Sequence, residues 1–290
     1  MRMTTAQKVK TILGAFSVRS DIKRLLIRKY WERRKTFTVN FSNVRAIFST
    51  ADFYSNHWFY GPQVDEGAYE PVTTRVLLSC LRNCTGFADV GANLGYFTVI
   101  AALVLKELPV FAFEMDATLA PLIKRNLELN NLVNVEVVAA AVGDTDGAAV
   151  SYTPHPISFA NLITGISTEP FRIQLTATTI SLDNYFAGKS AVPNFLKIDV
   201  DGAEMTVLHG MRRLLAQPDL QMLLEVHTQH LPQFGSSAAA VLEFLYQQGF
   251  RTYLLEQFRD NPSGRLREIR DASEVTTKSG DMMLVTRNSL

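Results

Sequence analysis

Residues 87–98 (FADVGANLGYFT) combine a short apolar strand, a glycine-containing loop and the start of a helix. The strand residues before Gly91 are apolar except for Asp89, as expected for a strand that is buried on both faces. Gly91 and Gly95 lie four residues apart, so the loop can turn tightly and bring its backbone close to a ligand. A helix is expected directly after Gly95.

Strands and helices alternate along the rest of the chain. Further apolar runs that favour strands lie at 109–114, 134–144, 194–201, 220–227, 250–257 and 281–287. Helical periodicity separates several of them, with one helix expected over 203–215. This alternation predicts a parallel sheet with helices on both faces, and right-handed crossovers make such a sheet doubly wound. The fold class is therefore predicted as α/β and Rossmann-like.

The chain before this sheet is predicted as an N-terminal helical and β extension. Residues 5–35 favour two helical pieces, because apolar side chains recur at three- and four-residue spacing. Residues 37–48 are rich in β-branched and aromatic residues, which favours a strand or a hairpin. Residues 52–71 contain two Gly and two Pro among aromatic residues, and they are predicted to form an irregular packed loop.

We therefore divide the chain into a basic helical arm with a strand or hairpin, 1–50, and a larger domain, 51–290. The core of the larger domain is expected over 72–257. Residues 145–182 lack helical periodicity, so they are predicted to be an inserted hairpin or loop.

Charge is distributed unevenly. Residues 1–35 hold eleven Lys and Arg against two acids, a net charge of +9, whereas the other 255 residues hold 18 basic and 26 acidic side chains, a net charge of −8. A basic arm can lie on an anionic membrane surface as a peripheral contact, or pack on the acidic body or a second subunit of a homo-oligomer. We expect no nucleic-acid partner, because the body is acidic and shows no basic patch with interleaved aromatics.

The two cysteines, Cys80 and Cys84, exclude a disulfide scaffold and a cysteine-rich zinc site. No uncharged apolar run reaches the roughly 18 residues that a membrane-spanning helix needs. We expect a cytoplasmic protein, with membrane association through the basic arm left open.

The acid after the second strand indicates a nucleoside ligand. Glu114 follows Gly91 by 23 residues, and an acid at such a position can accept both hydroxyls of a ribose. Asp89 can receive an ammonium group at the end of the first strand. The fingerprints G-x-G-x-x-G and G-x-x-x-x-G-K-S/T are both absent, which disfavours a dinucleotide or a nucleoside triphosphate. S-adenosylmethionine carries a ribose and an amino-acid cation without pyrophosphate, so it fits; a purely structural turn is the alternative.

Several segments together resemble the FkbM-type S-adenosylmethionine-dependent methyltransferases. They are Tyr69-Glu70-Pro71, FADVGANLGYFT (87–98), FAFEMD (111–116), AVGDTDG (141–147), LKIDVDGAEMTVLHG (196–210) and LLEVH (223–227). The resemblance implies a methyltransferase sheet whose last strand, DMMLVTR (281–287), is antiparallel. It also implies O-methylation of a hydroxyl on a sugar, a glycan or a natural product. Met115 and Asp201 stand where the family often has Pro and Glu.

The cofactor site is predicted from the glycine loop, the strand-end acids and this resemblance. Its expected residues are Glu70, Asp89, Gly91, Ala92, Asn93, Gly95, Tyr96, Glu114, Met115, Asp144 and Asp199. Asp144 is placed to contact the adenine amino group, or it is a turn residue before Asp146-Gly147. A position for Glu70 over the cofactor is implied only by the resemblance.

Methyl transfer to a hydroxyl benefits from a base, and the expected catalytic residues are Asp199, Glu225 and His227 at the ends of two strands. Either Asp199 or His227 acts as the base, or Asp199 and Glu225 orient the acceptor. Glu204 either shares this role or stabilises a helix N-terminus. Asp199, Asp201 and Glu225 have oxygen ligands suitable for Mg²⁺, but no metal is predicted. The alternative to an enzyme is a catalytically silent Rossmann-like module used for binding or scaffolding.

Overall fold

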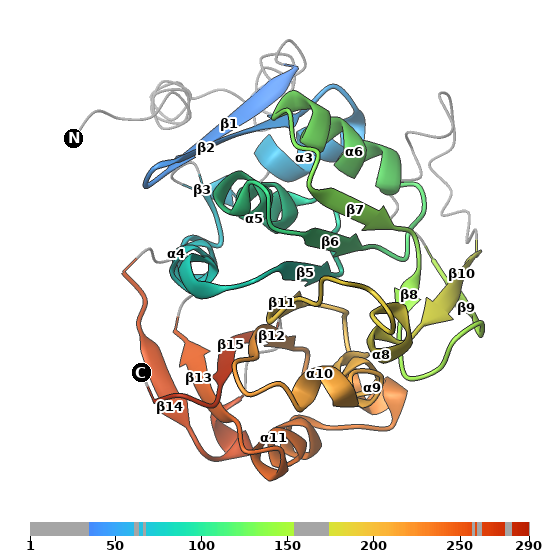
Figure 1. Cartoon of the computed structure of the whole chain (residues 1–290), viewed down its shortest axis with the longest axis vertical. Helices are drawn as coiled ribbons and strands as arrows, with labels where there is room; N and C mark the ends of the chain where they lie inside the picture. The colour runs from blue at the N-terminus through green and yellow to red at the C-terminus, as the bar shows by residue number, and fades with distance from the viewer. Residues whose placement is uncertain are drawn as a thin grey trace, which may run out of the picture.

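A computed structural model describes residues 35–60, 64–65, 68–153, 174–256, 259, 263–275 and 280–289. The predictions for the basic arm therefore lie outside the described residues, except at Lys35. An eight-stranded sheet forms the centre of the described chain, and helices cover both of its faces (Figure 1).

The eight strands of the sheet follow the order β14-β13-β15-β12-β11-β5-β6-β7. Their bounds are β5 (Phe87–Val90), β6 (Val110–Phe113), β7 (Val135–Val138), β11 (Phe195–Ile198), β12 (Gln221–Val226), β13 (Arg251–Leu255), β14 (Leu266–Ile269) and β15 (Asp281–Thr286). The five strands from β12 to β7 are parallel, whereas β15 runs antiparallel to both β12 and β13. The predicted doubly wound, mostly parallel sheet with an antiparallel last strand is confirmed.

Two hydrophobic cores lie on opposite faces of this sheet, because alternate strand residues point to opposite sides. On β11, Phe195 joins the core shared with α4, α5 and α6, whereas Leu196 and Ile198 join the core shared with α8 to α11. The helices are α4 (Pro71–Cys80), α5 (Tyr96–Leu105), α6 (Ala120–Leu129), α8 (Leu182–Tyr185), α9 (Glu204–His209), α10 (Arg212–Leu215) and α11 (Ala238–Gln247). The described residues also form the short 3-10 helices η1 (Leu81–Asn83), η2 (Leu231–Phe234) and η3 (Ala272–Glu274).

The strand order reverses at β5. The chain first adds β6 and β7 on one side of β5 and then crosses to place β11 on the other side. Ligands of open α/β sheets bind outside the carboxyl ends of the strands at such a reversal. A binding site is therefore expected at the loops that follow Val90 and Ile198.

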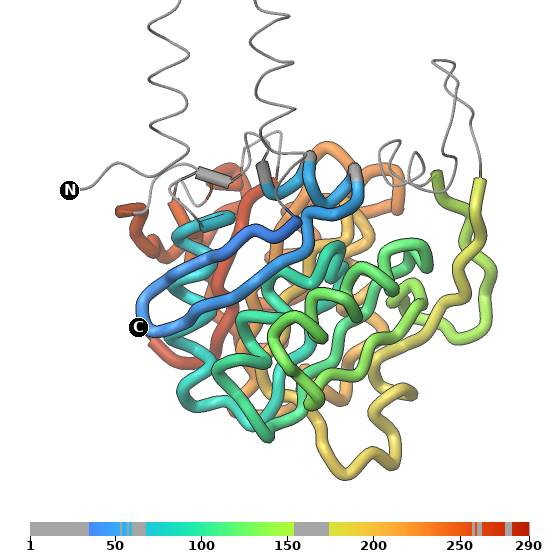
Figure 2. The backbone as a smooth tube through the Cα atoms, turned by 90° about the horizontal axis from the view of Figure 1, so that it is seen from above, coloured from blue at the N-terminus to red at the C-terminus, as the bar shows by residue number. Residues whose placement is uncertain are grey.

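An N-terminal hairpin covers one helical face, as Figures 1 and 2 show. Its strands, β1 (Thr36–Phe41) and β2 (Val44–Ser49), confirm the strand or hairpin predicted for residues 37–48. β2 packs on α5 and α6, and Val39 and Phe48 are buried in the same core as those helices. The hairpin is thus joined to the sheet domain by a shared core.

Asn126 on α6 links the hairpin to the glycine loop. Its side-chain oxygen accepts the Ser49 N–H at 2.7 Å, and its amide group donates to the Leu94 carbonyl at 2.8 Å. Asn126 is fully buried, so water cannot replace either bond. One side chain therefore satisfies a backbone group of the hairpin and a backbone group of the loop.

Replacement of Asn126 by Ala is expected to lower the free energy of unfolding by about 3 kcal/mol, because it leaves two buried backbone groups unpaired. Urea denaturation measures this loss. Asn134→Ala is the matched control, since its amide makes one exposed bond to the Leu108 carbonyl at 2.9 Å. Equal losses in the two variants would contradict the anchoring role of Asn126.

The structure corrects the prediction of an irregular loop over residues 52–71. Residues Phe53–Tyr60 form the helix α3, and the short strands β3 (Val64–Asp65) and β4 (Ala68–Tyr69), which follow it in the chain, pair with each other. The Asp52 carboxylate accepts the Ser55 N–H at 2.8 Å, which starts the helix. The aromatic residues gave this helix no amphipathic period, so the sequence pattern missed it.

The strand predicted over 134–144 is also corrected, because it divides into β7 and the short strand β8 (Ala141–Val142). β8 leaves the large sheet and pairs with β10 (Leu175–Ile180), which in turn pairs with β9 (Ala149–Tyr152). β9 and β10 lie within the segment that was expected to hold an inserted hairpin or loop.

The predicted helix over 203–215 is interrupted after α9 at Gly210. A side chain at Gly210 would place its Cβ 1.8 Å from the Gly143 carbonyl oxygen, so only glycine allows the exit of β8 to pass. The Gly210 carbonyl also accepts the Asp183 N–H at 2.9 Å instead of continuing one helix. Packing against a neighbouring segment therefore breaks a helix that the local sequence favours.

Candidate active site

The glycine loop and the loop after β11 touch at the strand-order reversal. Gly91 has a φ of 82°, and a Cβ at this position would lie 1.9 Å from the Asp199 carbonyl oxygen. The Asp199 N–H in turn donates to the Val90 carbonyl at 3.0 Å. Only glycine permits this approach, which sets the predicted cofactor loop directly against Asp199.

Glu114 holds the glycine loop from the end of β6. Its two carboxylate oxygens accept the backbone N–H groups of Asn93, at 2.7 Å, and Asp116, at 2.8 Å. Burial raises the pKa of Glu114 to about 7, even though these two bonds favour the ionised form. The Asn93 side chain also accepts the Tyr54 hydroxyl at 2.8 Å, so α3 contacts the loop from outside.

Asp89 is buried at the end of β5. The Thr98 hydroxyl donates to its Oδ2 at 2.6 Å, whereas Oδ1 has no hydrogen-bond partner among the residues that the structure describes. Burial raises the pKa of Asp89, although Lys197 and Thr98 act in the opposite direction. A buried acceptor atom without a partner is suited to a cationic or hydrogen-bonding ligand.

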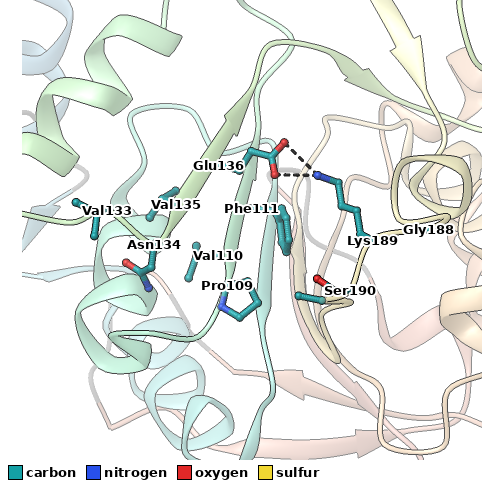
Figure 3. A pocket seen from close by; sticks show the side chains of 11 residues that line it. Pro109, Val110, Phe111, Val133, Asn134, Val135, Glu136, Gly188, Lys189 and Ser190 are labelled. Atoms are coloured by element: carbon teal, nitrogen blue, oxygen red, sulfur yellow. Dashed lines mark hydrogen bonds and ion pairs between the residues drawn. The ribbon is translucent and has the colours of Figure 1, made fainter.

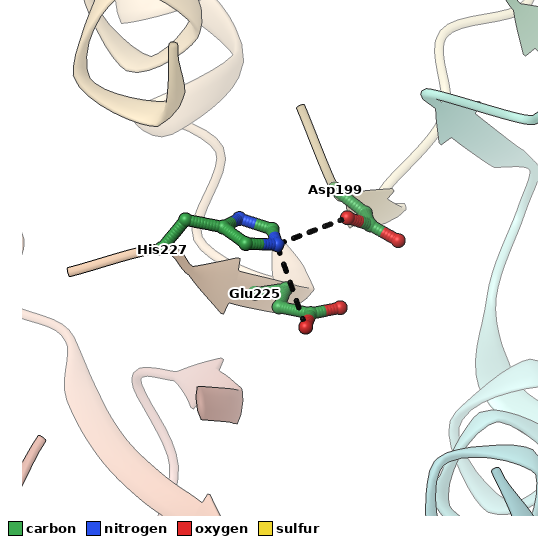
Figure 4. Close-up of side chains that lie close together, drawn as sticks. All are labelled: Asp199, Glu225 and His227. Carbon is green, nitrogen blue, oxygen red and sulfur yellow. Dashed lines mark ion pairs between the residues drawn. The ribbon is translucent and has the colours of Figure 1, made fainter. Parts of the chain in front are cut away.

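The three predicted catalytic side chains converge at the ends of β11 and β12, as Figure 4 shows. His227 Nε2 lies 3.5 Å from Glu225 Oε1 and 3.8 Å from Asp199 Oδ1. Glu225 is fully buried, His227 is nearly so, and Asp199 is partly exposed. Asp201 Oδ1 approaches the same nitrogen at 3.5 Å from the solvent side.

Glu204, at the start of α9, faces the other nitrogen of this histidine. Its Oε1 lies 2.7 Å from His227 Nδ1 and also accepts the Gly202 N–H at 3.0 Å. Gly202 has a φ of 108°, and a Cβ there would lie 2.6 Å from the Cβ of His230. The loops after β11 and β12 thus come together around His227.

Lys197 is a buried cation that the sequence pattern alone did not single out. Its Nζ donates to Asp199 Oδ2 at 2.9 Å and lies 4.9 Å from the centre of the Phe97 ring. Burial alone would lower the pKa of Lys197, but nearby acids outweigh this effect and raise it. Those acids are Asp199, Asp89, Glu70 and Glu225. A charged residue inside the apolar run NFLKI (194–198) was the available signal.

Arg259 is the second cation of the site, and it lies outside the segments that carry the family resemblance. It forms an ion pair with Glu225, and its Nε lies 3.6 Å from Glu70 Oε1. Glu70 is buried and has a left-handed φ of 43° at the start of α4. Arg259 therefore connects the predicted cofactor residue Glu70 with the end of β12.

The buried charges shift several pKa values. Burial, together with Asp199 and Glu70, raises the pKa of Glu225 to about 9. Burial acts to lower the pKa of His227, but the bond to Glu204 and the charges of Glu225 and Asp199 raise it to about 9. Burial acts to raise the pKa of Asp199, whereas Lys197 and His227 outweigh it and lower the pKa. At neutral pH the site therefore keeps Asp199 ionised and His227 protonated.

Among the described residues, Asp199, Glu225 and His227 offer ligand atoms within 4.8 Å of one another, which could hold a metal ion. Asp201, one of the acids considered for Mg²⁺, contributes only at the exposed rim. Asp199 and Glu225 already pair with Lys197 and Arg259, so their negative charge is partly neutralised.

Other predicted cofactor residues have different surroundings. The Tyr96 hydroxyl accepts the Tyr69 N–H at 3.1 Å inside the core, and Gly95 packs against Ile123. Ala92 is buried, whereas Met115 and Asp144 are exposed, and Asp144 follows β8 instead of a strand of the large sheet. Roles for these residues in cofactor binding stay predictions.

The open hollow in Figure 3 lies at the other end of the sheet. Pro109, Val110 and Val135 line it at the amino ends of β6 and β7, and Lys189 pairs with Glu136 at 2.9 Å beside it. The site described above lies at the carboxyl ends of the strands. The hollow therefore adds nothing to that site.

The strand order and the placement of the site define a Rossmann-like protein of the methyltransferase class. A family model described as "Methyltransferase FkbM domain" matches residues 89–252. The match covers more than half of the chain, which therefore belongs to the FkbM methyltransferase family. Among the described residues, no helix has both the length and the hydropathy that a membrane span requires.

The individual relatives have low sequence identity to this chain. "Hexuronic acid methyltransferase AglP" of Haloferax volcanii is 31% identical over 141 residues, 48% of this chain and 54% of the relative. "Methyltransferase 1" of Beauveria bassiana is 27% identical over 146 residues, 42% of this chain and 57% of the relative. The chain spans about half the length of these curated relatives. A solved FkbM methyltransferase from Methylobacillus flagellatus KT is 13% identical, with a TM-score of 0.43 over 92% of this chain and 60% of that chain.

Proposed function

We propose that this protein is an S-adenosylmethionine-dependent methyltransferase that methylates a hydroxyl group on a sugar, a glycan or a natural product. The contact between Gly91 and Asp199 carries the proposal. It places the predicted cofactor loop against the cluster of Asp199, Glu225 and His227. A methyl donor and a proton acceptor would then meet at one point of the fold, as transfer to a hydroxyl requires.

The residues of the loop fit this cofactor. Asp89 offers an ammonium group a buried carboxylate oxygen that has no partner among the described residues, and Glu114 offers a carboxylate to ribose hydroxyls. Each Glu114 oxygen accepts one backbone N–H in the structure and retains a second lone pair. When bound, S-adenosylmethionine supplies an activated methyl group. Asp199 and Glu225 orient the acceptor, and the neutral form of His227 takes its proton.

The acceptor class rests on the family and on one relative. The relative from Haloferax volcanii is named a hexuronic acid methyltransferase, which supports a sugar hydroxyl as the acceptor. A catalytically silent module is the second candidate. The fold, however, would not need so many buried acids beside the glycine loop for its stability alone. A labelled methyl group appearing on a sugar acceptor would separate the two.

Calorimetry with S-adenosylhomocysteine tests cofactor binding, and the affinity is expected to fall about tenfold from pH 8 to pH 6. Glu114 has a pKa of about 7, so the carboxylate form that accepts ribose hydroxyls becomes scarce below pH 7. Binding must then release a proton, which weakens it. His227 and Glu225, with pKa values of about 9, change little over this range.

Glu114→Gln is the control, because it keeps an acceptor oxygen and cannot titrate. This variant should bind more weakly at pH 8 and lose most of the pH dependence. Absence of binding to the unmodified protein at both pH values would refute the cofactor assignment. Equal pH dependence in the variant would remove Glu114 from the ribose site.

A further inference from the structure

Glu204 is a fully buried carboxylate whose contacts lie inside the active-site cluster. Its Oε1 is 2.7 Å from His227 Nδ1, and its Oε2 has no hydrogen-bond partner in the described part of the chain. A glutamate that only stabilised a helix N-terminus would lie at the protein surface or bond to the first turn of its helix. Glu204 instead points across to the end of β12.

The contacts of Glu204 determine which nitrogen of His227 carries hydrogen. Oε1 accepts the Gly202 N–H at 3.0 Å, and an ionised carboxylate has only acceptor oxygens. Nδ1 must therefore be the donor in its short contact with Oε1. In the neutral histidine, Nε2 then has a free lone pair, and this atom faces the acids at the strand ends.

Nε2 of His227 faces the position where the proposed reaction would occur. Charged and titratable groups face His227 from every neighbouring element: Glu204 from α9, Asp199 and Asp201 from the loop after β11, Glu225 from β12, and His230 from the loop after β12. Lys197 forms an ion pair with Asp199, and Arg259 forms one with Glu225. Glu204 is the one among these groups that contacts Nδ1 within 3 Å in the described structure.

We propose that Glu204 is a positioning residue: it fixes His227 with Nδ1 protonated and Nε2 directed at the acceptor, and it balances the charge of the imidazolium that forms. The inference rests on the proposed function. In that reaction the acceptor oxygen bonds to the methyl carbon while the carbon–sulfur bond breaks, and sulfur keeps the electron pair. When His227 is in its neutral form, the hydroxyl proton passes to Nε2, and the imidazolium later releases it to water. Turnover should therefore rise as the pH approaches the His227 pKa of about 9.

The charge of Glu204 sets how strongly His227 holds that proton. Burial acts to lower the pKa of His227, and the bond to Glu204 is the largest contribution that raises it, to about 9. Removal of the Glu204 charge should therefore lower the pKa of His227 by about one unit or more. A residue with a purely structural role would leave this value unchanged.

Nitrogen-15 NMR of the unmodified protein tests the geometry without any risk of misfolding. The chain has five histidines, and the spectrum of His227→Gln assigns the signals of His227. Above pH 10 the neutral ring is expected to carry its hydrogen on Nδ1. The opposite tautomer, with hydrogen on Nε2, would overturn the proposal.

Glu204→Gln tests the charge. The NMR titration of His227 and the acidic limb of the kcat/KM profile for methyl transfer are both expected to move to lower pH, by about one unit or more. Asp201→Asn is the matched control, because it removes one exposed charge 3.5 Å from Nε2. Its shift should be clearly smaller, since solvent screens an exposed group.

The outcomes separate this inference from the proposed function. If the protein transfers no methyl group, the proposed function fails, while the NMR titration still reports whether Glu204 controls His227. An unchanged titration of His227 in Glu204→Gln overturns the positioning role. A shifted titration with an unmoved kinetic limb shows that His227 is not the base, and it overturns the catalytic part.

Discussion

Asparagine in place of Asp199 is expected to lower the turnover of methyl transfer about a hundredfold or more, while the affinity for S-adenosylhomocysteine changes little. Asp199 lies where the glycine loop meets the end of β11, and its pKa is lowered by Lys197 and His227 against the effect of burial. It is therefore ionised at neutral pH and can orient the acceptor hydroxyl and His227. The amide keeps the size and one acceptor oxygen but loses the charge.

The measurement is a comparison of kcat with the calorimetric Kd. In the Asp199→Asn variant the amide oxygen can still accept the hydrogen bond from Lys197 Nζ, so the fold around the loop should persist. Asp201→Asn serves as the control for a charge change near the same histidine, and its effect on turnover should be much smaller. Turnover at the unmodified rate in Asp199→Asn would end the assignment of Asp199 to the chemistry.

Methionine in place of Lys197 is expected to lower the free energy of unfolding at pH 7 by about 3–5 kcal/mol, because it leaves buried carboxylates without their central cation. Lys197 is buried beneath four acids that raise its pKa. Since the pKa of Lys197 is raised above its unfolded value, loss of the lysine proton reduces this stabilisation only above about pH 10. The full effect should therefore appear at neutral pH.

Lys189→Met is the matched control for this prediction. Lys189 pairs with Glu136 at 2.9 Å, the same distance as Lys197 to Asp199, but both partners are accessible to solvent. Its loss should cost less than about 1 kcal/mol in urea denaturation. The deficit of Lys197→Met should also be smaller at pH 5 than at pH 8, because the orphaned acids can then take up protons. Equal losses for the two lysines would contradict the proposed role of Lys197.

The parts of the fold that could be predicted from sequence are those set by local pattern. The strand before Gly91, the acids at the strand ends and the strand at 281–287 follow from apolar runs and their limits. The antiparallel direction of that last strand was implied by the family resemblance. The helix α3 was missed because its aromatic residues lack a helical period. The break at Gly210 was missed because its cause, the Gly143 carbonyl, is distant in sequence.

The site residues also divide into those that the local sequence pattern predicts and those that tertiary packing determines. Asp199, Glu225 and His227 were predicted together because parallel strands bring their carboxyl ends to one edge. Lys197 was open to prediction as a charge within a buried strand. Arg259 was not, because its partners Glu225 and Glu70 reach it only through tertiary packing. Glu204 was assigned either to a helix start or to the site, and the local pattern could not reveal its contact with His227.

The N-terminal hairpin has a thermodynamic consequence for the cofactor loop. The Asn126 side chain bonds to Ser49 in the hairpin and to Leu94 in the glycine loop, and the Tyr54 hydroxyl donates to Asn93 of the same loop. The hairpin and α3 are therefore coupled to the glycine loop. Free-energy coupling between two sites is reciprocal. A ligand that orders the loop must then also stabilise the docked hairpin against local opening. The free energy of that stabilisation equals the free energy by which the docked hairpin strengthens ligand binding.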